Sequence, residues 1–511
     1  MGLIPLFLAA VGARAFSTVQ WSPAPLLLPL PAHVTSGPSS PSERSDVVYI
    51  EHTKANPFAF PLTAATSVAL LQAVRRGADS VFVMGPAASV SPSSDGATLA
   101  PPPLGSCAVA IASANVSLHL GVDEQYALDL TKSSCEIRAA TVWGAMHGLE
   151  TLSQIIVFEY DKHIVAHDDP AKQPPHYIVA QAPWHVLDAP RFQHRGVMLD
   201  TARHFYPVAS ITRLLAGMRA LKLNAFHWHL SDAQSMPYVS AALPKLGRGA
   251  LAPALTYSAA DVRAVVLFGY ERGIRTIIEV DTPSHCWAIG VGYPEHMLNC
   301  TAMYPMAENF WKGGLDVTST ATFEFIEQLI LELAGLNRDV NPSAVEWHIG
   351  GDEVEYDCWD SSPRIAAYRN KTGLNNSALF AMFQTKMFAV LKKHQLTPWS
   401  WTNWDAIDAR PGSGARLPDG AISQVWTGGP SALNRSSNLG RGIKVVKSDG
   451  FYIGGSNWYS SYDSRVFSWN EVDDPSAIIG AEACIWSELM GPGIIDAFVW
   501  DSLRALSERW W

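Results

Sequence analysis

The sequence predicts an α/β protein, a (β/α)8 TIM barrel preceded by a small α+β domain, and three observations support this. At 511 residues the chain is too long for a single core. From His194 onward, apolar strand-like segments alternate with helical stretches, which is the pattern of a parallel sheet with crossover helices. Eight such segments can be counted, and a closed barrel needs eight strands. We therefore expect the small domain over 16–188 and the barrel over 189–511.

The first fifteen residues predict a secretory signal peptide. MGLIPLFLAAVGARA has a short apolar stretch and then the small-residue pattern Ala13-Arg14-Ala15, so cleavage is expected after Ala15. A basic n-region is lacking, which leaves a buried or frayed N-terminal segment as the alternative. The remaining chain has no apolar stretch long enough for a membrane span. We expect a soluble protein of the secretory pathway, in a lysosome-like compartment or outside the cell.

Glycosylation signals and cysteines agree with that route. Asn-x-Ser/Thr acceptors begin at Asn115, Asn299, Asn370, Asn375 and Asn434, although each triplet alone is a weak signal. The six cysteines suit two disulfides and two buried thiols, and position alone leaves their pairing open. With 37 basic and 47 acidic residues the formal charge is −10, which argues against a nucleic-acid partner.

The small domain shows alternating segments and one helical pattern. The segments 47–52, 80–85, 116–121 and 126–130 are typical of strands in a sandwich-like region. The Pro/Ser-rich stretches 23–45 and 87–105 are typical of irregular surface segments. Trp143, Met146, Leu149 and Leu152 recur at helix spacing, which predicts a helix there.

The barrel strands are predicted from apolar runs. They lie at 194–200, 224–232, 275–281, 344–353, 397–402, 421–426, 444–452 and 478–486. Helices are predicted at 210–223 and 320–336, because each stretch starts with Ser or Thr and carries apolar residues at three- and four-residue spacing.

Reactive and aromatic side chains collect at the carboxyl ends of these strands, which meet at one pocket in a barrel. The set is His229, Asp232, Asp281, His285, Asp352, Glu353, Trp401, Trp426, Tyr452, Trp486 and Glu488. Adjacent carboxylates such as Asp352 and Glu353 can be driven to different pKa values, one as proton donor and one as ionised partner. The alternative is an exposed Gly-Gly-Asp-Glu turn. The tryptophans favour a box for a flat ligand such as a pyranose, and the alternative is that they plug the barrel.

These motifs together resemble the β-N-acetylhexosaminidases of glycoside hydrolase family twenty, over about 126–511. The resemblance rests on RGVMLDTARHFYP, KLNAFHWHLSD, EVDTPSHCWA, HIGGDEV, the QVW run, GFY and IGAEACIWSE. It implies exo-acting hydrolysis of terminal β-linked GlcNAc or GalNAc by a substrate-assisted retaining mechanism. In that mechanism Glu353 is the general acid/base and Asp352 orients the 2-acetamido group. Tyr452 hydrogen-bonds the acetamido carbonyl.

The resemblance also implies the rest of the site, with no cofactor and no metal. Trp401, Trp426 and Trp486 match the apolar walls, while Arg195 and Glu488 match groups that bind sugar hydroxyls. His285 and Asp281 match the positions near the acid. For Arg195 a structural ion pair below the barrel core is the alternative. The resemblance further pairs Cys107 with Cys135 and Cys300 with Cys358, leaving Cys286 and Cys484 as buried thiols.

The sequence departs from the family pattern in several places. Gly454 stands where relatives have a carboxylate, which predicts weaker binding and a shallow choice between GlcNAc and GalNAc. Asn403 and Ala233 replace acidic residues. The chain also stops at Trp511 inside what resembles the last helix, so we expect a truncated or imperfectly closed barrel.

Two other functions stay open, as does a homodimer. One is an inactive protein that binds N-acetylhexosamine, although such a protein has no need for an intact set of Asp352, Glu353 and Tyr452. The other is a metal-dependent hydrolase, because His227 and His229 mimic the His-x-His of metal-dependent barrels.

Overall fold

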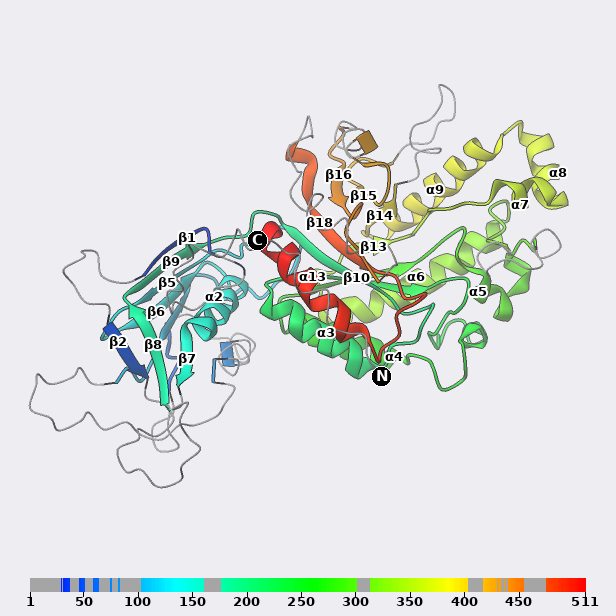
Figure 1. Cartoon of the computed structure of the whole chain (residues 1–511). Coiled ribbons are helices and arrows are strands. Elements are labelled where there is room, and N and C mark those ends of the chain that lie inside the picture. Colours follow the sequence, from blue (N-terminus) through cyan, green and yellow to red (C-terminus); the bar gives the residue numbers. More distant parts are fainter. Residues whose placement is uncertain are drawn as a thin grey trace, which may run out of the picture.

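The structure, a computed structural model, forms two lobes joined side by side (Figure 1). It describes residues 103–159, 176–300, 313–402, 417–429, 440–454 and 475–511. Shorter pieces are described at 29, 31–36, 46–50, 58–63, 74–75, 81–82, 431–432 and 436. The predicted signal peptide, Asn403, Asn434 and most of 23–45 and 87–105 lie outside the described residues.

The N-terminal lobe is built from two sheets and one long helix. The six-stranded sheet has the order β1-β9-β5-β6-β4-β3, and the three-stranded sheet has the order β2-β8-β7. Helix α2, Val142–Ile155, packs on the larger sheet and begins at Thr141, whose side chain accepts from the Gly144 N–H. The strands are β1 His33–Ser36, β2 Asp46–Ile50, β3 Leu62–Thr63, β4 Ala108–Ile111, β5 Tyr126–Leu130, β6 Cys135–Ala139, β7 Ile156–Glu159, β8 His176–Ala182 and β9 Trp184–Asp188.

The sequence predictions for this lobe have mixed outcomes. The strand at 126–130 and the helix around Trp143 are confirmed, and 47–52 overlaps β2. Of 80–85 only 81–82 is described, as a turn. The strand predicted at 116–121 is wrong, because its polar groups bind other elements instead of a sheet partner. The Leu118 carbonyl accepts from Asn341 Nδ2 at 2.9 Å, and the Ser117 carbonyl accepts from Trp143 Nε1 at 3.0 Å.

The second lobe is a closed parallel barrel. Its strands follow one another in chain order, and β18 pairs with β10 to complete the circle. All eight predicted strands are confirmed, except that the seventh is split into β16 and β17, which both pair with β18. The strands are β10 His194–Asp200, β11 Ala225–Ser231, β12 Arg275–Val280, β13 Glu346–His348, β14 Thr397–Trp401, β15 Ile422–Val425, β16 Lys444–Lys447, β17 Tyr452–Ile453 and β18 Ile478–Ile485.

Helices surround this barrel and cover its strands (Figure 1). They are α3 Val208–Ala220, α4 Ala259–Tyr270, α5 Trp287–Gly292, α6 Thr320–Val340, α7 Tyr356–Ser361, α8 Pro363–Thr372, α9 Asn376–Lys393 and α13 Ile495–Trp510, with 3-10 turns η1 Leu246–Gly249, η2 Pro294–His296 and η4 Pro475–Ala477. Both helices predicted in this lobe are confirmed as α3 and α6. The expectation of imperfect closure is wrong, because β10 and β18 pair over six residue positions, from His194 with Gly480 to Leu199 with Ile485. No helix among the described residues is both long and apolar enough to cross a membrane.

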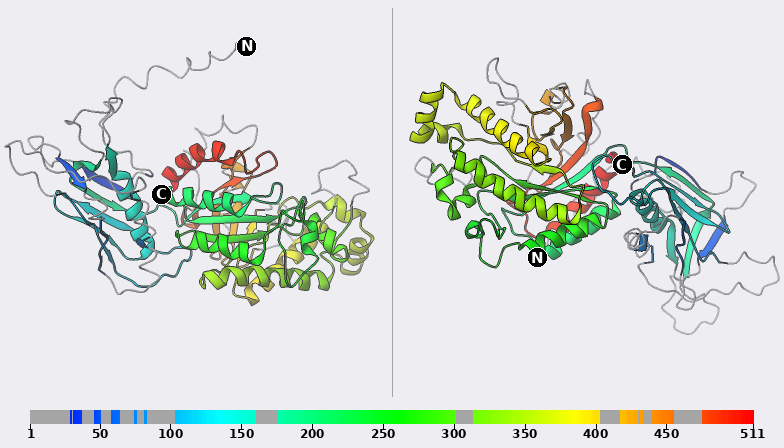
Figure 2. Two further views of the ribbon diagram at one scale, coloured as in Figure 1. Left: turned by 90° about the horizontal axis from the view of Figure 1, so that it is seen from below. Right: turned by 180° about the vertical axis from the view of Figure 1, so that it is seen from behind.

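The lobes meet at the amino ends of the barrel strands, near the C-terminal end of the chain (Figure 2). Glu124 of the N-terminal lobe receives Arg195 Nη2 at 2.6 Å and Asn224 Nδ2 at 2.9 Å. Leu120 packs against a buried cluster inside the barrel that includes Ile277 and Trp399. The first lobe therefore contributes a side chain to the packing of the barrel's lower half.

Both disulfides implied by the family resemblance are present. Cys107 is bonded to Cys135 and Cys300 to Cys358, with Cα atoms 4.4 and 5.5 Å apart. Cys286 and Cys484 are free and buried, as expected.

Candidate active site

A cavity of about 420 Å³ opens at the carboxyl ends of the barrel strands. That is the end at which barrel enzymes hold their catalytic groups. Its lining residues are Arg203, His285, Asp352, Glu353, Trp426, Tyr452, Ile453, Gly454, Trp486, Glu488 and Leu489. Seven of the ten residues predicted for the site are in this set, so the structure brings most of them together.

The turn after β13 sets the positions of Asp352 and Glu353. Gly350 and Gly351 have φ values of 72° and 101°, in the region that favours glycine. A Cβ atom on Gly350 would lie 1.7 Å from Asp281 Oδ1, so the close approach of this turn to β12 requires glycine. Glu353 itself adopts a φ of 49°, which a side-chain-bearing residue rarely does. Strain of this kind, held by the surrounding structure, is typical of functional sites.

Asp352, which lines the pocket, and Asp281 behind it form a buried carboxyl pair. The Gly351 N–H donates to Asp281 Oδ1 at 3.0 Å. Burial raises the pKa of Asp281 well above its usual value, and the Asp352 charge raises it further. Burial also raises the pKa of Asp352, with a further increase from Glu353. Two such close carboxyls cannot both ionise easily, so Asp281 is the member that keeps the proton and can donate it to Asp352.

Glu353 is connected to two buried groups behind it. Its Oε2 lies 3.3 Å from His285 Nε2, and His285 Nδ1 lies 3.2 Å from Asp232 Oδ1. Contact with His285 lowers the pKa of Glu353 in the empty pocket. Burial opposes a charge on His285, but Asp232 and Asp352 outweigh it and raise the pKa of His285 well above its usual value. His285 therefore holds a proton next to the half-exposed Glu353 carboxylate.

Aromatic rings form the walls and floor of the cavity. Trp486 lies between Trp401 and Tyr452, with centroid distances of 5.9 and 6.3 Å. Trp401 is fully buried and lies under the cavity, where its Nε1 donates to Glu279 Oε1 at 2.7 Å. The Tyr452 hydroxyl donates to the Trp426 carbonyl at 3.0 Å. These residues can bind an apolar group and one face of a ring.

The outer end of the cavity has charged groups on one side and apolar groups on the other. Arg203 Nη1 lies 3.7 Å from Glu488 Oε1, and its guanidinium lies 5.1 Å from the Trp486 ring. On the other side, a Cβ atom on Gly454 would lie 2.3 Å from the Met490 methyl group. Gly454 has a φ of 112°, so a side chain at this position would also strain the backbone. The Met490 side chain thus occupies the space that a side chain at 454 would need.

The prediction that Arg195 binds sugar hydroxyls is wrong. Arg195 lies at the amino end of β10, fully buried, and pairs with Glu124 at 2.6 Å. A seven-residue strand is roughly 20 Å long, so this side chain is at the opposite end of the barrel from the pocket. The pocket arginine is Arg203, which follows the same strand. Its place just beyond the carboxyl end of the predicted strand was the signal that could have identified it.

The predicted site residues Asp281 and Trp401 lie one layer below the cavity. Arg203 and Glu279 had no predicted role, and Asp232 was predicted at the pocket end of its strand without a specific role. Asp232 is held by Arg203 Nη2 at 2.8 Å and His229 Nε2 at 2.9 Å. These cations outweigh burial and lower the pKa of Asp232 far below its usual value, so Asp232 is anionic.

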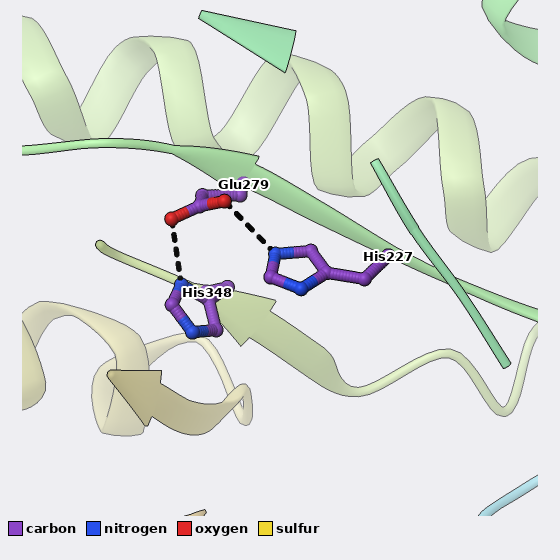
Figure 3. A group of neighbouring side chains, drawn as sticks. All are labelled: His227, Glu279 and His348. Atoms are coloured by element: carbon purple, nitrogen blue, oxygen red, sulfur yellow. Dashed lines mark ion pairs between the residues drawn. The ribbon is translucent and has the colours of Figure 1, made fainter. Parts of the chain in front are cut away.

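His227, Glu279 and His348 lie together inside the barrel, and their residue types could hold a metal ion (Figure 3). His227 Nε2 is 3.0 Å from Glu279 Oε2, while His227 Nδ1 is 2.7 Å from Glu482 Oε1. Burial opposes its charge, but the two carboxylates raise the pKa of His227 to about 9. A protonated imidazole has no lone pair for a metal. The arrangement therefore favours an ion-pair network over the metal site that His-x-His suggested.

Comparisons with known proteins agree with the fold. The model of "Glycosyl hydrolase family 20, catalytic domain" matches residues 192–511, and that of "beta-acetyl hexosaminidase like" matches 27–155. Beta-hexosaminidase subunit B2 of Dictyostelium discoideum is 31% identical over 427 residues, covering 79% of this chain and 70% of the relative. The chitooligosaccharidolytic beta-N-acetylglucosaminidase of Ostrinia furnacalis is 32% identical over 443 residues, covering 77% and 69%. The chitobiase structure of Flavobacterium johnsoniae has a TM-score of 0.70 and 26% identity, covering 95% of this chain and 69% of that one.

Proposed function

The chain belongs to glycosyl hydrolase family 20, and from that premise we propose that it removes terminal β-linked N-acetylhexosamine from glycoconjugates. It is a glycoside hydrolase on a (β/α)8 barrel. The observation that carries the proposal is that two separate carboxyl groups, each with its own buried partners, lie in one cavity with aromatic walls. Asp352 lines the cavity with Asp281 behind it, and Glu353 and His285 line its side with Asp232 behind them.

The Glu353 side supplies the proton for the leaving group. In the empty pocket His285 carries the proton and Glu353 is ionised. A sugar in the cavity displaces water from Glu353, and desolvation favours its neutral form. The proton then moves from His285 Nε2 to Glu353 Oε2 and onward to the glycosidic oxygen. In the second half of the reaction the Glu353 carboxylate accepts a proton from the attacking water.

The Asp352 side positions the internal nucleophile. An Asp352 carboxylate accepts the acetamido N–H of the sugar and so turns the acetamido oxygen toward the anomeric carbon. Protonated Asp281 donates to Asp352 and stabilises that carboxylate. Burial raises the pKa of Tyr452 far above its usual value, so its hydroxyl stays protonated and, once turned away from the Trp426 carbonyl, can donate to the acetamido carbonyl. The rings of Trp426 and Trp486 enclose the acetyl methyl and the sugar face, and Trp401 supports Trp486 from below.

The outer end of the cavity supports exo-action with a shallow epimer preference. Arg203 and Glu488 are the groups that bind the outer sugar hydroxyls. The opposite wall is formed by Gly454 and Met490, which carry no charge. A C4 hydroxyl of either configuration therefore has few fixed hydrogen-bond partners there. The test is hydrolysis of chromogenic GlcNAc and GalNAc β-glycosides, side by side, from acidic to neutral pH. Binding of GlcNAc without turnover of either glycoside would favour the inactive sugar-binding protein instead.

We further propose a secreted or lysosome-like location, with the signal peptide at 1–15. Among the predicted glycan acceptors, Asn115, Asn299, Asn370 and Asn375 are exposed, as attachment requires.

The partner is a glycan or glycoconjugate and no nucleic acid, in agreement with the formal charge of −10. A homodimer remains a proposal that size-exclusion chromatography with light scattering can test.

A further inference from the structure

A line of alternating carboxyl and imidazole groups runs from Glu353 into the barrel. Its members, in order, are Glu353, His285, Asp232, His229, Glu279, His227 and Glu482. Successive nitrogen–oxygen distances are 3.3, 3.2, 2.9, 2.5, 3.0 and 2.7 Å. The five members from Asp232 to Glu482 have no exposed side-chain surface. The mechanism above uses only the first three, and we call the whole set the ladder.

The geometry of His229 fixes its charge. Nδ1 faces Glu279 Oε2 at 2.5 Å, and Nε2 faces Asp232 Oδ2 at 2.9 Å. A neutral imidazole has one N–H, so one of its nitrogens would point a lone pair at a carboxylate oxygen. Both contacts are favourable only when His229 is doubly protonated. Glu279 is the counter-ion that makes this possible so far from water.

The charge on His229 affects how tightly Asp232 holds His285. Asp232 already has Arg203 Nη2 at 2.8 Å and the His229 imidazolium. Two cations neutralise more than one carboxylate charge, so Asp232 has less hold on a third cation at His285. A proton on His285 is then more easily released to Glu353.

We propose that Glu279 is a positioning residue for the reaction: it keeps His229 charged, and the charged His229 favours transfer of the proton from His285 to Glu353. The inference rests on the proposed function. No atom is gained or lost inside the ladder. One proton leaves His285 Nε2 and binds Glu353 Oε2. The other proton of His285 stays on Nδ1 and remains directed at Asp232.

His229 and His285 also have other charged groups around them. His229 also faces Asp200 after β10, His227 on β11 and Asp281 after β12. His285 also faces Arg203, Asp281 and Asp352. His348 is kept neutral by burial, which lowers its pKa, and its Nδ1 accepts the Gly350 N–H. Glu279 is the ladder member that contacts both His229 and His227.

The test compares wild type with Glu279→Gln on two substrates with different leaving groups. The amide oxygen can still accept from Trp401 Nε1, so the floor of the pocket is preserved, and the amide N–H can donate to His229 Nδ1, which makes His229 neutral. Chitobiose needs a proton on its leaving oxygen, whereas 4-nitrophenyl β-GlcNAc needs it far less. We expect kcat/KM for chitobiose to fall about tenfold more than for the nitrophenyl glycoside. The basic limb of the chitobiose pH profile should move to higher pH by about one unit, because Asp232 then holds the His285 proton more tightly and a tenfold change in proton affinity corresponds to one unit.

Glu346→Gln is the matched control. Glu346 is also a buried barrel glutamate, and it pairs with Arg275 outside the ladder. This variant should lose stability without changing the ratio of the two substrates or the pH profile. An equal loss on both substrates in Glu279→Gln, with an unmoved basic limb, would overturn the proposal.

A second measurement does not depend on activity. Nitrogen-15 NMR of labelled histidines, with His229 assigned from a His229→Asn variant, should show two protonated nitrogens on His229 at pH 6 in the wild type. Glu279→Gln should show one. A neutral His229 in the wild type would overturn the proposal. If the wild type hydrolysed neither substrate, the proposed function would fail, while the NMR result would still decide the charge on His229.

Discussion

Glu124→Gln should weaken folding across the junction of the two lobes. Glu124 is buried and receives both terminal nitrogens of Arg195, at 2.6 and 3.1 Å, together with His147 and Asn224. Burial alone would raise its pKa, but Arg195 and His147 outweigh this and lower the pKa from 4.5 to about 2. At about 1.4 kcal/mol per unit, the shift corresponds to roughly 3 kcal/mol of stability.

The sign of the pH dependence follows from the direction of that shift. Because the folded-state pKa lies below the unfolded-state value, the contribution is complete above about pH 4.5 and is lost as the pH falls toward 2. Urea unfolding at pH 7, 5 and 3 measures it. The wild type should be more stable than Glu124→Gln by about 3 kcal/mol at pH 7, and the difference should shrink at pH 3.

A control and a companion variant complete this test. Glu136→Gln removes a carboxylate of the same lobe whose ion pair with Arg138 is about half exposed, so its effect should be below about 1 kcal/mol. Arg195→Met should destabilise like Glu124→Gln while leaving the KM for GlcNAc glycosides unchanged. A tenfold rise in that KM with normal stability would refute the structural role assigned to Arg195.

Four further predictions concern the pocket. Glu353→Gln should abolish turnover of substrates with poor leaving groups and leave their binding nearly intact, as steady-state kinetics and calorimetry with GlcNAc can show. Asp352→Asn should lower kcat/KM more for 2-acetamido substrates than for 2-hydroxyl analogues. Glu488→Gln should raise KM about tenfold with little change in kcat, since a charged hydrogen bond contributes about 1.5–3 kcal/mol. Gly454→Asp should lower the melting temperature through about 1–3 kcal/mol of strain, and Met490→Ala added to it should restore part of the loss; an unaltered melting temperature of the single variant would contradict the packing described here.

The barrel strands could be predicted because each is a buried apolar run whose partner is the next strand along the chain. Periodicity alone gave the limits of β10 to the residue. It missed the division of the seventh strand, because both halves, β16 and β17, keep the apolar pattern and only their pairing with β18 separates them. The stretch 116–121 was misread for a related reason. It alternates like a strand, but Leu118 packs in the core of the N-terminal lobe, Leu120 packs against the barrel, and its carbonyls bind side chains of other elements.

The sequence could predict which residues reach the site, but not how these residues contact one another. Strand ends identify which side chains reach the pocket, and this gave Asp352, Glu353 and the aromatic residues. The prediction for Arg195 failed because it rested on the motif around this residue. Arg195 lies at the amino end of its strand, whereas the pocket lies at the carboxyl ends. The ladder could not be predicted, because it depends on ring orientations and on pairings between β11, β12 and β18 that no sequence spacing encodes.

The junction of the lobes changes what counts as the catalytic unit. A polypeptide cut at residue 189 would keep every pocket residue. It would leave Arg195 as a buried cation without its carboxylate and remove Leu120 from the cluster at the lower half of the barrel. We expect such a fragment to be recovered from expression as insoluble material, and mixing it with a separately produced N-terminal lobe to be the way to restore it. The N-terminal lobe, which supplies Glu124 and Leu120 to the amino end of the barrel, is translated before the first barrel strand. The order of synthesis therefore favours folding of this lobe before the barrel closes.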